Sequence, residues 1–187
     1  MRLNRCRRIP LAAAGLLMTL GFRRQALEQL FARTAAAFGA PVPPPRSRTS
    51  DGRLLEYARF TRAQAEAALK RGDDLAALDR RLHRAAYGLG ARYRLLLGVR
   101  SVAQAMAAAR LLYRGLGIDF RGSPDGEVTI GRCGFARTYT PQVCGLISAL
   151  DRGLMAGLAH GGELRFRQRI TEGADSCTAC LEGVSPA

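Results

Sequence analysis

A turn with the sequence Gly-Ser-Pro-Asp-Gly at residues 122–126 separates two kinds of hydrophobic pattern in this chain. Before the turn, the spacing of apolar residues is typical of helices. After it, residues 127–132 and 163–170 alternate between apolar and polar side chains, which predicts strands, and residues 176–181 are a third candidate. Between them a helix is expected over residues 141–158, because Pro141 suits a first helical turn and two glycines follow the end.

This order of elements predicts an α+β fold, with a helical N-terminal part followed by a small, mainly antiparallel sheet packed on a helix. Residues 127–182 should form that sheet against the 141–159 helix. In the helical part, Thr61 is expected to begin a helix that stops at Gly72. Asp73 or Asp74 should cap the next helix, and Ser101 a third that ends near residues 115–117.

One linker is clear in the sequence. Residues 41–45 read Pro-Val-Pro-Pro-Pro, and a stretch rich in Arg, Ser and turn-forming residues continues to Gly52. A chain of 187 residues suits one domain with a helical extension. We therefore predict an amphipathic helical segment over residues 1–40, a proline-rich linker over 41–52, and an α+β domain over 53–187 whose first half is helical and whose second half carries the cysteines.

The N-terminal segment has an apolar run at residues 9–22 with arginines on both sides. The run is shorter than the roughly 20 residues that span a membrane. We expect one or two helices over residues 10–38, which either pack on their own domain or lie on an anionic membrane surface. A cleaved export signal is the third alternative, but Arg23 and Arg24 stand where a cleavage site would be. The predicted location is cytoplasmic, with peripheral binding to the inner face of the membrane as a further possibility.

The net charge of +14 comes almost entirely from arginine and lies in the first two-thirds of the chain. A nucleic-acid reader combines a basic face with stacking aromatic residues or a recognition motif. This chain has no Trp, few other aromatic residues and no such motif. The composition therefore argues against nucleic-acid binding and favours a solvated or membrane-facing basic surface. It does not define an oligomeric state.

Four of the five cysteines lie in the second half, at positions 133, 144, 177 and 180. Nothing convincing directs the chain to an oxidising compartment, so reduced thiols are expected rather than disulfides. The spacing of Cys177 and Cys180 is that of a pair of metal ligands. Zinc or an iron–sulfur cluster bound by Cys133, Cys144, Cys177 and Cys180 is one alternative, a nucleophilic cysteine is a second, and buried inert thiols are a third. We expect the four cysteines to converge on one pocket, as metal ligands or as a nucleophile site.

The 141–158 helix places Cys144, Ser148, Asp151 and Met155 on one face, because they recur at three- and four-residue intervals. A carboxylate on the apolar side of a helix needs a partner. Asp151 should therefore meet a cation such as Arg152 or Arg165, an amide donor or a ligand. The turn that precedes Cys177 contains Gly173, which allows a bend that brings Glu172 near the thiol.

Residues 125–182 resemble the C-terminal half of the L-2-amino-thiazoline-4-carboxylic acid hydrolase family. The resemblance rests on Cys133 after a strand, on Tyr139, Pro141 and Cys144 at the start of a helix, on Asp151, and on Glu172-Gly173 followed by Cys177. It implies a small α+β hydrolase that opens a cyclic amidine. The fold is also similar to the vinyl-reductase-type domains that bind small molecules and metals.

Two functions follow as expectations. In the first, the protein hydrolyses a C–N bond of a small cyclic amidine, and the thiol of Cys177 or Cys144 attacks the amidine carbon. Asp151 or Glu172 accepts and returns the proton. The substrate is bound by Arg165, Arg169 and Tyr139. In the second, the protein is a non-catalytic module that binds a metal, a cluster or a small ligand, held near a membrane by residues 10–38.

Overall fold

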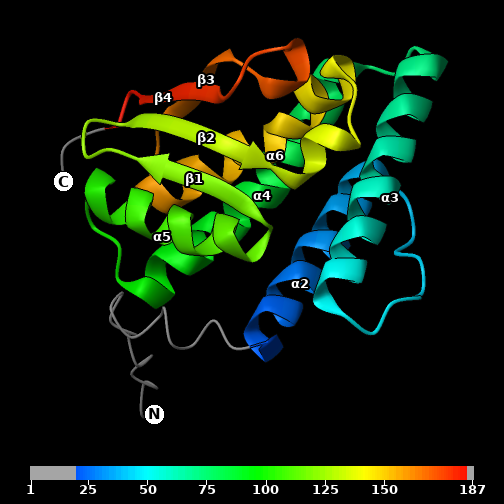
Figure 1. The fold of residues 1–187 in the computed structure, drawn as a ribbon, viewed down its shortest axis with the longest axis horizontal. Coiled ribbons are helices and arrows are strands. Elements are labelled where there is room, and N and C mark those ends of the chain that lie inside the picture. The colour runs from blue at the N-terminus through cyan, green and yellow to red at the C-terminus, as the bar shows by residue number, and fades with distance from the viewer. Residues whose placement is uncertain (1–19, 185–187) are drawn as a thin grey trace.

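The computed structural model describes residues 20–184 and confirms the α+β fold (Figure 1). The α-helices are α2 (Leu20–Phe38), α3 (Ser50–Arg71), α4 (Leu75–Leu97), α5 (Val102–Gly115) and α6 (Pro141–Ala159). The strands are β1 (Ile118–Gly122), β2 (Glu127–Cys133), β3 (Glu163–Gln168) and β4 (Cys177–Glu182). Two short 3₁₀ turns, η1 (Gly134–Arg137) and η2 (Ile170–Glu172), follow β2 and β3.

The four strands form one antiparallel sheet in the order β1-β2-β4-β3. β1 and β2 are a hairpin around the predicted turn, and the chain then crosses through α6 to β3. β4 turns back and inserts between β2 and β3, where it pairs with both. The inner face of the sheet is apolar, and its outer face carries the alternating polar residues.

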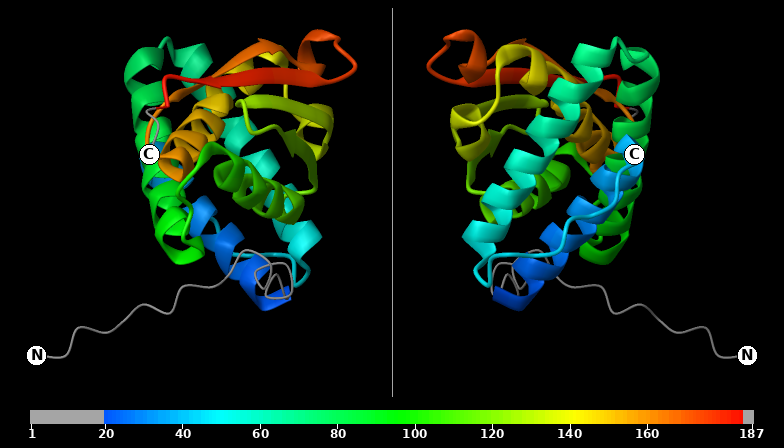
Figure 2. Two further views of the ribbon diagram at one scale, coloured as in Figure 1. Left: turned by 90° about the vertical axis from the view of Figure 1, so that its left-hand side faces the viewer. Right: turned by 90° about the vertical axis from the view of Figure 1, so that its right-hand side faces the viewer.

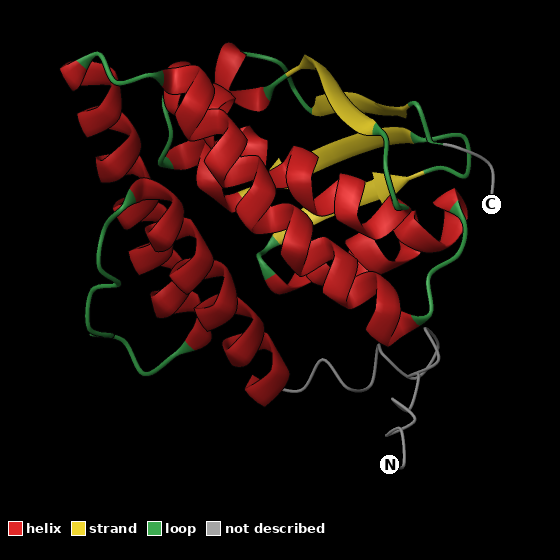
Figure 3. Cartoon of the chain, turned by 180° about the vertical axis from the view of Figure 1, so that it is seen from behind, coloured by secondary structure: helices red, strands yellow, loops and turns green. Residues whose placement is uncertain are grey.

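The inner face of the sheet packs on α5 and α6, and α4 packs on the opposite side of α6. The side views show the sheet, α6 and α4 in succession, and the view from behind shows helices covering the sheet (Figures 2 and 3). The prediction of a sheet against the 141–159 helix is therefore confirmed. β1 and the contribution of α5 were not predicted, because a five-residue strand directly after a helix leaves little alternation to detect.

Helices α4 and α6 approach each other backbone to backbone through three glycines. A Cβ atom added to Gly90 would lie 2.3 Å from the Leu154 carbonyl oxygen. One added to Gly153 or Gly157 would lie 2.1 Å or 2.3 Å from a carbonyl oxygen of α4. No real Cβ is that close to an oxygen, so the spacing of these helices requires glycine at all three positions.

The helix caps explain where the helices begin. Asp74 and Ser101 accept hydrogen bonds from backbone amides three residues on, which confirms both predicted caps. The prediction that Thr61 starts a helix was wrong, since α3 begins at Ser50 with Thr49 as its cap. Thr61 is buried within α3, where its hydroxyl bonds back to the Tyr57 carbonyl oxygen instead of capping an amide.

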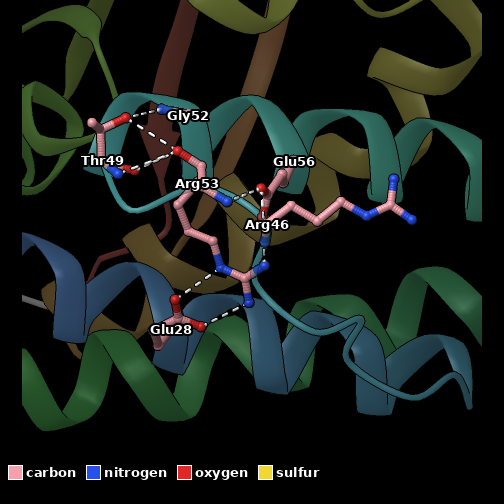
Figure 4. Close-up of polar contacts among 7 residues, drawn as sticks. Glu28, Arg46, Thr49, Gly52, Arg53 and Glu56 are labelled. Atoms are coloured by element: carbon pink, nitrogen blue, oxygen red, sulfur yellow. Dashed lines mark hydrogen bonds and ion pairs between the residues drawn. The ribbon is translucent and has the colours of Figure 1, made fainter.

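Residues 39–49 connect α2 to α3, and an ion-pair cluster joins the two helices (Figure 4). The buried Arg53 guanidinium donates to both carboxylate oxygens of Glu28 on α2, at 2.8 Å and 2.9 Å, and to Glu56 at 2.8 Å. It also stacks over the Phe31 ring at 4.3 Å. These bonds compensate the desolvation of the cation. The predicted linker thus joins parts of one core.

The apolar side of α2 is used for internal packing. Leu27, Phe31 and Ala37 are buried in the same core as the sheet and α6. This is the arrangement expected of a helix that packs on its own domain. The part of the predicted helix at residues 10–19 lies outside the described residues.

Among residues 20–184, no single helix has the length and apolar character needed to cross a membrane. Only α4 and α5 taken together reach that length and composition, and the break between them is bent by 109°.

The glycine contact predicts opposite effects for two alanine substitutions in α6. Gly153→Ala should lower the free energy of unfolding by about 1–3 kcal/mol, because the added methyl overlaps α4. Gly145→Ala should raise it by about 0.5–1 kcal/mol, because no atom lies within 4 Å of the new Cβ and alanine favours the helix. Urea denaturation followed by circular dichroism measures both. Equal effects of the two substitutions would contradict the close contact.

Candidate functional site

A cavity of about 90 Å³ lies between the inner face of the sheet, α6 and the helices below it. Its wall is mainly apolar and includes five aromatic side chains: Tyr57, Tyr113, Phe135, Tyr139 and Phe166. The hydroxyls of Tyr57 and Tyr139 are paired with Thr34 at 3.1 Å and Thr61 at 2.6 Å. The hydroxyls of these two phenols therefore already have hydrogen-bond partners within the protein.

The polar cavity-lining residues that the sequence predicted on one helix face come from α6. Cys144, Ser148 and Asp151 all line the cavity, as expected from their spacing. Met155, the fourth member of that face, is fully buried and does not line it. The Ser148 hydroxyl donates to the Gly145 carbonyl oxygen at 2.7 Å, so it is turned along its own helix.

Asp151 is the only acidic residue among those that line the cavity, and its partner is a phenol. The Tyr113 hydroxyl donates to Asp151 Oδ1 at 2.7 Å. The two predicted cations pair elsewhere: Arg152 with Asp79 on α4, and Arg165 with Glu163 and Glu182 on the outer face of the sheet. Burial raises the pKa of Asp151 from 3.8 to about 6, although the Tyr113 bond and the charges of Arg169 and Arg152 oppose the rise.

Among the described residues that line the cavity, Arg169 is the only basic one. Its guanidinium stacks over the Phe166 ring at 4.7 Å and reaches Glu172 at 3.3 Å and the Ser148 hydroxyl at 3.5 Å. These two polar contacts are long, and the Nε atom is buried with no hydrogen-bond partner in the described part of the chain. The side chain is 21% exposed, so the guanidinium is partly accessible to solvent. Arg169 therefore has an unused donor at the cavity.

Three thiols line the same cavity: those of Cys133, Cys144 and Cys177. Burial raises the pKa of Cys133 to about 12. It also raises the pKa of the Cys144 and Cys177 thiols, while Arg169 opposes the rise in both. Two neighbouring groups also lower these thiol pKa values, as Arg169 does. The Thr171 hydroxyl acts on Cys144, and the Ile170 amide donates to Cys177 Sγ at 3.4 Å. All three thiols are protonated at neutral pH when the cavity holds no further cation.

Cys180 does not join the other three cysteines. Residues three apart in a strand point to opposite faces, and Cys180 lies opposite Glu127 in the β2–β4 register while Cys177 is buried on the inner face. The prediction that four cysteines converge on one pocket was therefore wrong for Cys180. Within residues 20–184, no group of three or more His, Cys, Asp or Glu side chains is arranged to hold a metal ion.

The other predicted site residues divide between the cavity and the surface. Tyr139 lines the cavity. Arg165 does not, because its side chain is 62% exposed on the outer face of the sheet. Glu172 is exposed, does not line the cavity, and forms an ion pair with Arg169. Asp151, rather than Glu172, is thus the carboxyl that lines the cavity together with the thiols.

Sequence reasoning missed Tyr113 and Thr171. Tyr113 lies 38 positions before Asp151, on another helix, and nothing in the local pattern connects the two. Thr171 belongs to η2, in the stretch that the sequence predicted as a polar turn, and no role at the site was predicted for it. The buried carboxyl itself was the available signal, since it required a donor from some other part of the chain.

Asp151 should make stability depend on pH in an unusual direction. Its pKa is higher in the folded state than in the unfolded chain, so the folded state binds the proton more tightly, and stability should fall as pH rises from 4 through 6. A difference of about two pKa units corresponds to roughly 3 kcal/mol. Asp151→Asn removes the charge and keeps an oxygen for Tyr113, so it should flatten this dependence and stabilise the protein at pH 7.5.

The measurement is the free energy of unfolding in urea at pH values between 4 and 8. Asp175→Asn is the matched control, because Asp175 is an exposed carboxyl in the same half of the chain. The same pH profile for wild type and Asp151→Asn would refute the assignment.

Comparison with known proteins gives this chain no relative. No family model matches the sequence. No curated protein and no solved structure matches it either. The resemblance to the thiazoline-carboxylate hydrolases therefore stays a prediction from the cysteine, aspartate and glycine positions.

Proposed function

We propose that this protein binds a small molecule with an apolar body and one anionic group, in the cavity between the sheet and α6. The observation that carries the proposal is the unpartnered Nε of Arg169 at the wall of an otherwise apolar cavity. Ligand sites of this kind combine an apolar lining with a few polar groups that fix orientation.

An anion suits this cavity because it supplies the hydrogen-bond acceptor that the Nε of Arg169 lacks. A carboxylate, sulfonate or phosphate accepts parallel hydrogen bonds from a guanidinium. The long contact between Arg169 and the exposed Glu172 leaves that capacity largely unused. The aromatic side chains and the protonated thiols then contact the apolar body of the ligand.

Asp151 couples such binding to protonation. A bound anion near Asp151 raises its pKa further, because the two negative charges repel each other. With the pKa already at about 6, the carboxyl takes up a proton when the anion binds near neutral pH. Affinity for a permanently charged anion is therefore higher at pH 5.5 than at pH 7.5.

An alkylsulfonate such as hexanesulfonate is a suitable probe, since its own charge does not change over this range. Isothermal titration should show binding that weakens at least tenfold in Arg169→Gln, with partial recovery in Arg169→Lys. Arg165→Gln is the matched control, because Arg165 lies on the outer face, and it should bind as wild type does. Equal affinity in wild type and Arg169→Gln would overturn the proposal.

A second candidate is the hydrolysis of a cyclic amidine, favoured by the fact that Cys144, Cys177, Asp151 and Arg169 line one cavity. In this mechanism Arg169 binds the substrate carboxylate, and a cysteine sulfur adds to the amidine carbon as its proton passes to ionised Asp151. Asp151 returns that proton to the ring nitrogen as the ring C–N bond breaks. Water then displaces the cysteine sulfur, which recovers its proton. Because burial holds the thiols protonated, the reaction needs the Asp151 carboxylate.

The hydrolase candidate makes its own prediction. Turnover of an aminothiazoline carboxylate, followed by chromatography of the ring-opened product, should rise with pH as Asp151 ionises, with a midpoint above 6 because the bound substrate carboxylate raises the pKa of Asp151 further. Replacement of the attacking cysteine, Cys144 or Cys177, by Ser should lower turnover at least a hundredfold. Cys180→Ser is the control on the other face of the sheet and should retain full activity. Binding of the substrate without turnover would exclude hydrolysis and leave the binding function intact.

A further inference from the structure

A second cavity, of about 50 Å³, lies next to the one described above, on the side away from the sheet. Four leucines line both cavities and form the wall between them: Leu30, Leu89, Leu116 and Leu154. Each comes from a different part of the helical layer, namely α2, α4, the end of α5 and α6. All the described residues that the two cavities share are therefore leucines.

The far end of the second cavity offers no unused charge. Arg23 lines it, but this guanidinium donates to the Gly115 carbonyl oxygen at 2.7 Å and to Asp51 at 2.6 Å. The partners of Arg23 come from α3 and the end of α5. Among the described residues that line the two cavities, the unpartnered guanidinium donor is therefore at the Arg169 end, and the guanidinium at the far end already has its partners.

We propose that the two cavities are one elongated site, and that its ligand is an unbranched amphiphile with an anionic head. This inference rests on the proposed function. The head binds Arg169, and the alkyl tail passes between the four leucines into the second cavity. Leucine side chains exchange between staggered rotamers, and a wall made of leucine side chains opens without breaking any hydrogen bond. An unpartnered guanidinium donor at one end and a row of leucines beyond it fit a long-chain carboxylate or sulfonate better than a compact ring.

A series of unbranched alkylsulfonates, from butane- to dodecanesulfonate, tests the length of the site. All are used below the concentrations at which they form micelles. Each methylene that enters an apolar site should tighten binding by about fourfold. Wild type should therefore gain affinity with each added methylene well beyond the length that fills the first cavity, and then level off.

Two substitutions at the far cavity make the test specific, since Ala26 and Leu112 line the second cavity and not the first. Ala26→Leu fills that cavity, so the gain in affinity should stop at a shorter chain while short sulfonates bind unchanged. Leu112→Ala enlarges it and should move the plateau to a longer chain. Ala63→Leu, an exposed position on α3, is the control for adding a leucine to a helix.

The outcomes separate the two proposals. If affinity stops rising at a chain length that fills only the first cavity, and neither substitution changes that length, the ligand is confined to the first cavity. The elongated site is then wrong, while the binding function stands. If no sulfonate binds to wild type at any chain length, both the proposed function and the elongated site fail.

Discussion

The backbone contact between α4 and α6 fixes the position of everything that faces the sheet. Gly90, Gly153 and Gly157 leave no side chain between the two helices, so their axes cannot separate or slide without opening a gap or a clash. Because α6 is held on that side, its other face must meet the sheet at a set distance. The side chains there, Cys144, Ser148 and Asp151, are consequently held at the cavity by a contact on the opposite side of their own helix.

The fixed position of α6 keeps the Asp151 carboxyl buried, and burial raises its pKa. In the described structure this carboxyl has a phenol as its direct partner, while Arg152 binds Asp79 and Arg169 contacts Phe166 and Glu172. Its ionisation therefore opposes folding, whereas the exposed ion pairs of the sheet contribute little either way. A group in this state responds to what enters the cavity: a cation stabilises the carboxylate, and an anion stabilises the acid.

Local patterns were sufficient to predict most of the fold but only part of the site. The caps at Asp74 and Ser101, the helix from Pro141 and three of the four strands follow from side chains within a few positions. Arg169 and Arg165 show the limit, since four positions apart in a regular strand they would share a face. A register shift after Phe166 and the start of η2 turn Arg169 to the cavity and leave Arg165 outside. Such an irregularity depends on pairing with β4, which no local pattern shows.

The place of β4 in the sheet has a consequence for the order of folding. β2 and β3 are not hydrogen-bonded to each other, so the sheet is not continuous until β4 lies between them. The β3–β4 pairing joins neighbouring segments of the chain, but the pairing of β4 with β2 joins residues about fifty positions apart. Contacts between distant residues form late because the connecting loop must first lose its entropy. Closure of the cavity should therefore coincide with the last cooperative step of folding. During synthesis, a nascent chain whose residues 177–182 have not yet emerged from the ribosome has no cavity for a ligand to fill.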